Sequence, residues 1–390
     1  MSEPKMSFMS QDEIEIIHNA SLKVLEDTGI KVMSDKALDI LKKAGARVDY
    51  EKSHATIPEN LVEEALKRAP KTIKYCARNP KYDFVLSKQE PHFCFDGDPP
   101  FIFDWETGKR RYSTSEDIAR CSVVADYLDN VHFLWTMCTA NDIPAPMQHL
   151  IEFITCLRNT GKHVEHEALD ARDAQYQIEI AAAIAGGREK LRERPIFSAV
   201  QCPISPLGYD KGITEASIEF AKAGIPVVYM AEPLAMETSP ATLAGTLVIV
   251  NAENLASLVI SEFASPGAPA IYSTAACIAD PSSGTDTGSS GSSLLNLGSA
   301  QIAHYYELPC EICGPAALYL SFWMPYSYET AIGINRNLHP GADIVCGWAT
   351  SPEALLIENE IINSALELAQ GFEVNDDTLA VDVINKVGPG

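Results

Sequence analysis

Basic residues are scarce in this sequence. Its 390 residues include 30 lysines and arginines against 53 aspartates and glutamates, which gives a formal net charge of −23 at pH 7. A surface of that sign repels phosphate groups, so the composition argues against nucleic acids and anionic membranes as partners.

Long apolar runs and the pattern of a secretion signal are lacking too. Apolar stretches such as residues 246–250 are broken by Asn, Glu and Ser well before the roughly 20 residues that a membrane helix needs. Residues 1–12 show no basic segment followed by an apolar one. The ten cysteines lie mostly in apolar segments, where a reduced thiol packs as a small hydrophobic group. The sequence predicts a cytoplasmic protein without a disulfide framework.

The first 90 residues have the spacing of short amphipathic helices. Apolar residues recur at helical intervals from residue 10, Gly29 interrupts them, and further helices are predicted over 35–44 and 58–69. Residues 75–88 are typical of a hairpin around Asn79 and Pro80. We expect residues 1–90 to form a helical and extended layer that packs on the rest of the chain.

From residue 92 the pattern becomes eight short apolar runs, each followed by an amphipathic window. The predicted strands are 92–97, 132–139, 163–167, 196–201, 227–232, 270–275, 310–314 and 344–348. The predicted helices are 115–128, 146–159, 171–184, 210–222, 240–260, 292–306, 328–338 and 352–370. Eight such units predict an α/β fold, a (β/α)8 TIM barrel over residues 91–390. A doubly wound open sheet is the alternative, but no Gly-x-Gly-x-x-Gly turn follows the first strand.

The ends of the predicted strands lack lysine and arginine. They carry carboxylates, with aromatic residues close by in the sequence. Such a set is poorly suited to a phosphate or to Schiff-base chemistry and better suited to a cationic ligand.

Two short motifs raise the possibility of a metal site. His163 and His166 enclose Glu165, and Cys310 and Cys313 are also three residues apart. On a strand, residues with that spacing point to opposite faces, so neither pair can bind one ion without a bulge. We therefore expect no tightly bound metal.

The segment 279–293 is rich in glycine and serine and has no P-loop lysine. It is compatible with a flexible surface loop. It is equally compatible with a backbone that a large flat cofactor approaches closely at a helix N-terminus.

Several long segments carry a resemblance to a known family. MSFMSQDEIEIIHNASLKVLEDTGIKV at 6–32, FDWETGKRRYST at 103–114, and LAGTLVIVNAEN at 243–254 with PGAP at 266–269 resemble the trimethylamine methyltransferase family. The resemblance implies a (β/α)8 barrel that passes a methyl group from a methylated amine to the cobalt of a separate corrinoid protein. It also implies a C-terminal extension of tens of residues, which relatives have beyond the point where this sequence ends.

Founding members of that family carry pyrrolysine after the seventh strand. Here Phe322, Trp323 or Met324 stands in its place. The resemblance then implies a quaternary amine such as glycine betaine as substrate, with cobalamin carried by the cognate corrinoid protein. The candidate substrate-binding residues are Phe95, Asp96, His166, Glu167, Gln201, Tyr229, Glu232, Tyr272, Tyr319, Trp323, Asn335 and Trp348. The candidate contacts to the corrinoid are Gly284, Gly288, Ser289, Ser290, Gly291 and Gly314.

Two other functions stay open at this point. Phe322, Trp323 and Met324, with Tyr326 and Tyr328, would fill the space above the barrel in a protein that only binds quaternary amines. A metal-assisted hydrolase would use His163, Glu165 and His166. A homo-oligomer is expected because symmetric assemblies are common among enzymes.

Overall fold

The computed structural model describes residues 8–86, 91–96, 99–104, 106–279, 286–287, 290–313, 342–348 and scattered positions between 352 and 363. Eight parallel strands form its centre: β6 (His92–Asp96), β9 (Phe133–Trp135), β10 (His163–Glu167), β11 (Phe197–Gln201), β13 (Val227–Ala231), β15 (Ala270–Thr274), β18 (Cys310–Cys313) and β19 (Ile344–Trp348). Their order in the sheet is β6-β19-β18-β15-β13-β11-β10-β9. The first strand therefore pairs with the last, and the others follow in chain order.

The ends of this sheet meet. The amide of His132, just before β9, donates to the carbonyl of Phe93 on β6 across 2.8 Å. The imidazole Nδ1 of His132 in turn accepts a hydrogen bond from the amide of Phe93 at 3.0 Å. The predicted barrel is confirmed, and all eight predicted strands are present with ends that differ by a few residues at most, apart from β9, which stops at Trp135.

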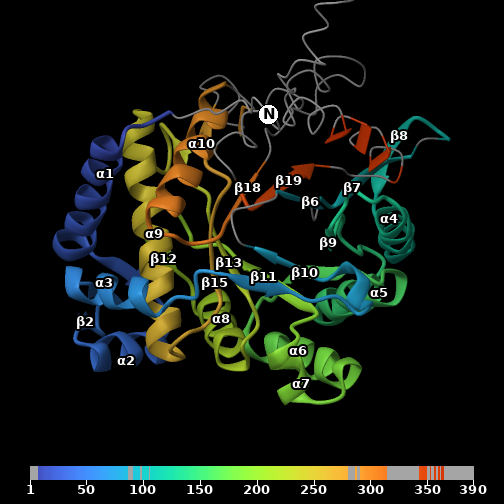
Figure 1. The fold of residues 1–390 in the computed structure, drawn as a ribbon, viewed down its shortest axis with the longest axis horizontal. Coiled ribbons are helices and arrows are strands. Elements are labelled where there is room, and N and C mark those ends of the chain that lie inside the picture. Colours follow the sequence, from blue (N-terminus) through green and yellow to red (C-terminus); the bar gives the residue numbers. More distant parts are fainter. Residues whose placement is uncertain are drawn as a thin grey trace, which may run out of the picture.

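Helices surround the barrel (Figure 1). They are α4 (Ser115–Tyr127), α5 (Gln148–Asn159), α6 (Ala171–Ala185), α7 (Arg188–Glu193), α8 (Lys211–Ala223), α9 (Leu243–Ala264) and α10 (Ser290–Tyr305). Thr114 caps α4 in a capping box with Asp117, and Asp210 caps α8 by accepting from the amide of Ile213. The helix predicted at 328–338 and most of the one predicted at 352–370 lie outside the described residues.

The N-terminal elements lie against the outside of the barrel helices. They are α1 (Gln11–Lys23), a π-helical turn η1 (Val24–Thr28), β1 (Ile30–Val32), α2 (Asp35–Ala44), β2 (Arg47–Asp49), β3 (His54–Thr56) and α3 (Glu59–Arg68). Figure 1 shows these blue helices beside the yellow α9, which contacts α1, α2 and α3. The predicted helices are thus present, and they pack against the barrel helix α9. The division into a layer and a barrel stays a prediction.

Helix α9 lies between the N-terminal helices and the barrel strands β13 and β15, which explains why it is so apolar. By length and composition this helix is apolar enough to cross a membrane, yet 72% of its most apolar window is buried inside the protein. It is the one helix of that kind in the part of the chain that the structure describes. Two of its buried polar side chains bond within the fold: Asn254 Nδ2 donates to the carbonyl of Ser273, and Glu253 accepts from Ser205 and from the amide of Leu207.

Small strands fill the connections. The predicted hairpin is formed by β4 (Ile73–Tyr75) and β5 (Phe84–Leu86), joined through a 3-10 turn η2 (Pro80–Tyr82). A second hairpin, β7 (Phe101–Asp104) with β8 (Lys109–Tyr112), follows β6, and a 3-10 turn η3 (Ala145–Met147) precedes α5. The short strands β12 (Gly208–Tyr209), β14 (Leu234–Ala235), β16 (Cys277–Ala279) and β17 (Asp286–Thr287) lie in loops after barrel strands, and β12 pairs with β1.

Candidate functional site

Two separate apolar clusters show which side chains face the inside of the barrel. The inner cluster contains Cys94, Phe133, Trp135, Val200, Val228, Met230, Ile271, Cys313, Ile344 and Cys346 from the strands, together with Ile73, Tyr75 and Leu86. The residues between them on the same strands, such as Phe93, Ala199 and Ile312, belong to the large cluster shared with the helices. Successive side chains on a strand point to opposite faces, so the two clusters are the inside and the outside of the barrel wall.

The hairpin β4–β5 closes the amino-terminal end of the barrel. Tyr75 stacks on His163 with ring centroids 4.1 Å apart, and its hydroxyl donates to Oε2 of Glu165 at 2.9 Å. Phe84 stacks on His92 at the same spacing. Aromatic rings thus plug this end, and a ligand has to enter at the carboxyl end of the strands, as in other barrels of this kind.

Glu165 belongs to this polar network inside the barrel. Its Oε2 also accepts from Ser198 Oγ at 2.6 Å, and Ser198 is 3.0 Å from Nε2 of His163. Burial raises the pKa of Glu165 to about 7, although hydrogen bonds from Ser198 and Tyr75 act in the opposite direction. Burial lowers the pKa of His163 to about 3, so this imidazole is neutral.

Two carboxylates and a thiol meet at the carboxyl end. Cys202, just after β11, donates from Sγ to Oε1 of Glu232, just after β13, at 3.3 Å. Glu167 ends β10, and burial together with the negative charge of Glu232 raises its pKa to about 7. Burial and the nearby Glu232 and Glu167 also raise the pKa of the Cys202 thiol, so it stays protonated. We call Glu167, Cys202 and Glu232 the acidic mouth.

Trp135 lies one level below Glu167 on the inner wall. Its Cα is the register partner of Glu165 on β10, and its side chain belongs to the inner cluster. The indole Nε1 is buried without a hydrogen-bond partner among the described residues. The sequence analysis missed this residue because it placed the end of the strand at residue 139, and the uninterrupted apolar run 133–135 does not show which side chains face inward.

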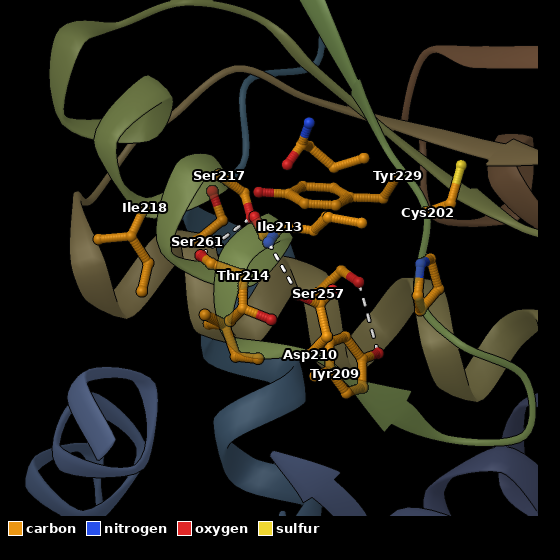
Figure 2. A pocket seen from close by; sticks show the side chains of 13 residues that line it. Cys202, Tyr209, Asp210, Ile213, Thr214, Ser217, Ile218, Tyr229, Ser257 and Ser261 are labelled. Carbon is orange, nitrogen blue, oxygen red and sulfur yellow. Dashed lines mark hydrogen bonds between the residues drawn. The ribbon is translucent and has the colours of Figure 1, made fainter. Parts of the chain in front are cut away.

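Three predicted aromatic residues face the wrong side of the strands. Phe95, Tyr229 and Tyr272 belong to the outer cluster, packed between strands and helices. Figure 2 shows the ring of Tyr229 beside Ser217, Ile213 and Ser261, in a pocket between the wall and helices α8 and α9, with the Cys202 sulfur directed away from it. This placement corrects the expectation that these three side chains bind the substrate.

His166 and Gln201 are also turned outward. His166 stacks on Phe153 of α5, and its two ring nitrogens lie 2.7 Å from Oγ1 of Thr136 and 2.9 Å from the carbonyl of His149. Gln201 lines the same outer pocket as Tyr229 and donates to the carbonyl of Val200. Neither side chain can contact a ligand inside the barrel, which corrects the prediction that they bind the substrate.

Of the candidate substrate-binding residues, Glu167 and Glu232 lie near each other and both belong to the acidic mouth. The backbone register pairs Asp96 with Trp348 at the ends of β6 and β19. Gly291 lies in the first turn of α10, with Ser290 at the start of that helix. The remaining candidates lie outside the described residues: Tyr319, Trp323, Asn335, Gly284, Gly288, Ser289 and Gly314, and so do Phe322, Met324, Tyr326 and Tyr328.

The two short motifs do not form metal sites. His163 faces the barrel interior and His166 faces α5, and Cys310 and Cys313 belong to the outer and the inner cluster respectively. A hydrolase using His163, Glu165 and His166 on one ion has no geometric basis here.

Comparison with known proteins was made for the whole chain. The profile of the trimethylamine methyltransferase (MTTB) family matches residues 1–390. A trimethylamine methyltransferase MttB from Desulfitobacterium hafniense is 36% identical over 97% of this chain and 78% of its own length. A glycine betaine methyltransferase from the same species is 30% identical over 99% of this chain and 82% of its own.

A solved structure has the same fold. The monomethylamine methyltransferase MtmB of Methanosarcina barkeri superposes with a TM-score of 0.59 at 12% identity, over 93% of this chain and 80% of that one. At this identity the likeness concerns the barrel alone. The family expected from the sequence and the barrel are both confirmed.

Proposed function

Because this chain belongs to the trimethylamine methyltransferase family and is a methyltransferase, we propose that it moves a methyl group from a quaternary amine to the Co(I) ion of a corrinoid on a separate protein. The acidic mouth carries this proposal. Glu167 and Glu232 supply negative charge at the carboxyl end of the barrel. The eight barrel strands contain neither lysine nor arginine.

The charge and shape of the mouth suit a cation that cannot donate a hydrogen bond. A quaternary ammonium group has only methyl groups on its surface, so ring faces and carboxylates attract it by electrostatics. Trp135 offers the ring below Glu167, and a favourable desolvated contact of this kind stabilises a cation by about 2 kcal/mol. Glu232 stays at the mouth because Cys202 donates to it.

The transfer itself needs little acid–base chemistry. Co(I) supplies an electron pair to the methyl carbon, the C–N bond breaks, and its electron pair stays on nitrogen. The products are methyl-Co(III) and a neutral tertiary amine, so no proton has to be donated to the leaving group. The chain's own contribution is to hold the cation, to exclude water and to align the C–N bond with the incoming cobalt.

The proposed substrate class is a quaternary amine of the glycine betaine type. The family resemblance supports it, since no pyrrolysine is encoded at 322–324, and one relative is named a glycine betaine methyltransferase. His166 and Gln201 point away from the inside of the barrel, so Asn335 and backbone amides remain the groups proposed to bind a substrate carboxylate. The proposed contacts to the corrinoid remain Gly284, Gly288, Ser289, Ser290 and Gly291 in the glycine–serine segment, and Gly314 after β18.

The proposed partner is a corrinoid protein, and the proposed setting is a homo-oligomer in the cytoplasm. These proposals rest on the family and on the negative net charge of the chain.

A spectroscopic assay tests the function directly. The protein is mixed with chemically reduced cobalamin and, one at a time, glycine betaine, proline betaine, carnitine, choline, trimethylamine and dimethylamine, while the visible spectrum follows the change from Co(I) to methyl-Co(III). Conversion with a quaternary amine and not with dimethylamine supports the proposal. Calorimetric binding of a quaternary amine without any conversion, even with a corrinoid protein added, would indicate a binding protein instead.

A further inference from the structure

Three side chains that can bind a metal converge inside the barrel, below the acidic mouth. They are Cys94 on β6, Cys346 on β19 and Glu311 on β18, and one ligand atom from each lies within 4.8 Å of the other two. The register pairs Cys94 directly with Cys346, and all three residues are at most 1% exposed. We propose that Cys94, Cys346 and Glu311 form a zinc site that joins the first strand of the barrel to its last two.

The chemistry of the three donors favours zinc. Cysteine thiolates and Asp or Glu carboxylates are both ligands of Zn²⁺, which holds sulfur at about 2.3 Å and oxygen at about 2.0–2.2 Å. Sulfur atoms around such an ion are about 3.8 Å apart by tetrahedral geometry. A contraction of at most about 1 Å would therefore bring the donors from their present spacing to that of a bound ion.

Glu165 offers a fourth donor beside this triad, although it lies outside the group whose ligand atoms are all within 4.8 Å of one another, so its carboxylate has to approach on binding. Its carboxyl group is close enough to that of Glu311 to alter its own pKa. Tyr75 and Ser198 both donate to Oε2 of Glu165, whereas Oε1 is buried without a hydrogen-bond partner among the described residues. The hydrogen bonds hold the carboxylate in place and leave one oxygen for an ion. Binding releases the two thiol protons to solvent.

The position suggests what the ion does. Strands β6 and β19 come from opposite ends of the barrel sequence. Their pairing therefore joins the two parts of the barrel that are farthest apart along the chain. A metal that links its two sides stabilises the folded chain by restricting the unfolded one, and methyl transfer as described above requires no such ion.

Two other triads of potential ligands are less suitable. His149, Glu152 and His166 lie together, but both ring nitrogens of His166 already have polar neighbours within 2.9 Å. His304, Cys310 and Asp343 also lie together, with Asp343 accepting from the amide of Cys310 and the side chain of His304 21% exposed. A zinc ion at either triad would have at most one sulfur ligand.

Metal analysis of the purified full chain tests the site without any turnover. After growth with zinc and dialysis against metal-free buffer, we expect about one zinc per chain, and a cobalt-substituted sample with thiolate-to-cobalt charge-transfer absorption. Cys94→Ser and Cys346→Ser should each lose at least nine-tenths of the zinc. Cys156→Ser, which changes a buried thiol on α5, should keep it. Equal zinc in all four proteins, or less than a tenth of an ion per chain, would mean an adventitious ion only and overturn the proposal.

X-ray absorption on the wild-type protein covers the case in which the cysteine variants do not fold. The proposed site predicts two sulfur and two oxygen neighbours around zinc. A shell with one sulfur and one imidazole, or with no sulfur, would overturn it.

Discussion

The Cys202 thiol donates to Oε1 of Glu232 across 3.3 Å, and so connects the loop after β11 to the loop after β13. Burial, and then the neighbouring carboxylates of Glu232 and Glu167, raise the pKa of the thiol and keep it protonated. Cys202 is therefore a positioning residue for Glu232 and does not act as a nucleophile.

Removing this thiol should weaken substrate binding. Cys202→Ala deletes the donor to Glu232. We expect KM for the quaternary amine to rise about three- to tenfold, because a hydrogen bond of this kind contributes about 1 kcal/mol. The value of kcat should change less than twofold. Cys202→Ser retains a donor and should restore KM to near the wild-type value. A nucleophilic thiol would instead give a large loss of kcat in both variants, measured by steady-state kinetics.

Trp135 should contribute through its ring. Trp135→Leu keeps an apolar side chain on the inner wall but removes the π face, so affinity for a quaternary amine should fall about tenfold or more, equivalent to about 1.4 kcal/mol or more. Trp135→Phe should lose less. The matched control is Tyr229→Phe on the outer face of the wall, where calorimetry should find the same affinity as in the wild type. Equal affinity in Trp135→Leu would exclude the indole from the site.

Binding should depend on pH through Glu167. Its pKa is raised to about 7, so the side chain is mostly neutral at pH 6 and mostly charged at pH 8. KM for a quaternary amine should therefore decrease as the pH rises from 6 to 8. Glu167→Gln should show a high KM that hardly varies over this interval. A wild-type KM that rises with pH would contradict the assignment.

Glu167 also has an opposite effect on stability. A carboxyl group whose pKa is higher in the folded than in the unfolded chain favours folding most below the unfolded pKa, near 4.5, and this contribution is lost as the pH rises through about 7. The negative charge of Glu167, which is proposed to bind the substrate, thus lowers the stability of the folded chain.

Lys162 should be needed for stability and not for activity. Its buried ammonium donates to the carbonyls of Ala125, Leu128 and Val131 at 2.7, 2.7 and 2.5 Å, in the last turn of α4 and just beyond it. Lys162→Met leaves these oxygens without that donor, and urea unfolding should show a loss of about 2–4 kcal/mol. Lys67→Met, at an exposed position of α3, should change stability by less than about 0.5 kcal/mol. Similar losses in both variants would refute this role.

The barrel could be predicted because parallel strands buried on both faces are short, mainly apolar runs. Several of these runs are followed by a described helix with a side-chain cap, such as Thr114 before α4 and Asp210 before α8. The site was predicted less well. The ends of strands selected Glu167 and Glu232, which lie near each other at the carboxyl end and remain proposed site residues. Proximity in sequence also selected Tyr229 and Tyr272, which are one residue out of phase with the inner wall.

Strand alternation would have removed these errors. Glu165 and Glu167 have the same parity on β10, and His166 between them must face the helices. The meeting of Cys94, Cys346 and Glu311 was beyond the reach of spacing rules, because it depends on the closure of the barrel between distant parts of the chain. The sequence likewise could not show that the indole N–H of Trp135 lacks a hydrogen-bond partner among the described residues, because this depends on the side chains around it in the closed barrel.

The most direct test of the central claim compares the wild type with Glu232→Gln, Glu167→Gln and the double variant in the cobalamin assay, with calorimetry of the same quaternary amine. If the acidic mouth binds the cation, each single variant should lose about tenfold in kcat/KM, about 1.4 kcal/mol, and the double variant about 100-fold. Methyl-Co(III) formation at the wild-type rate in the double variant would contradict the account.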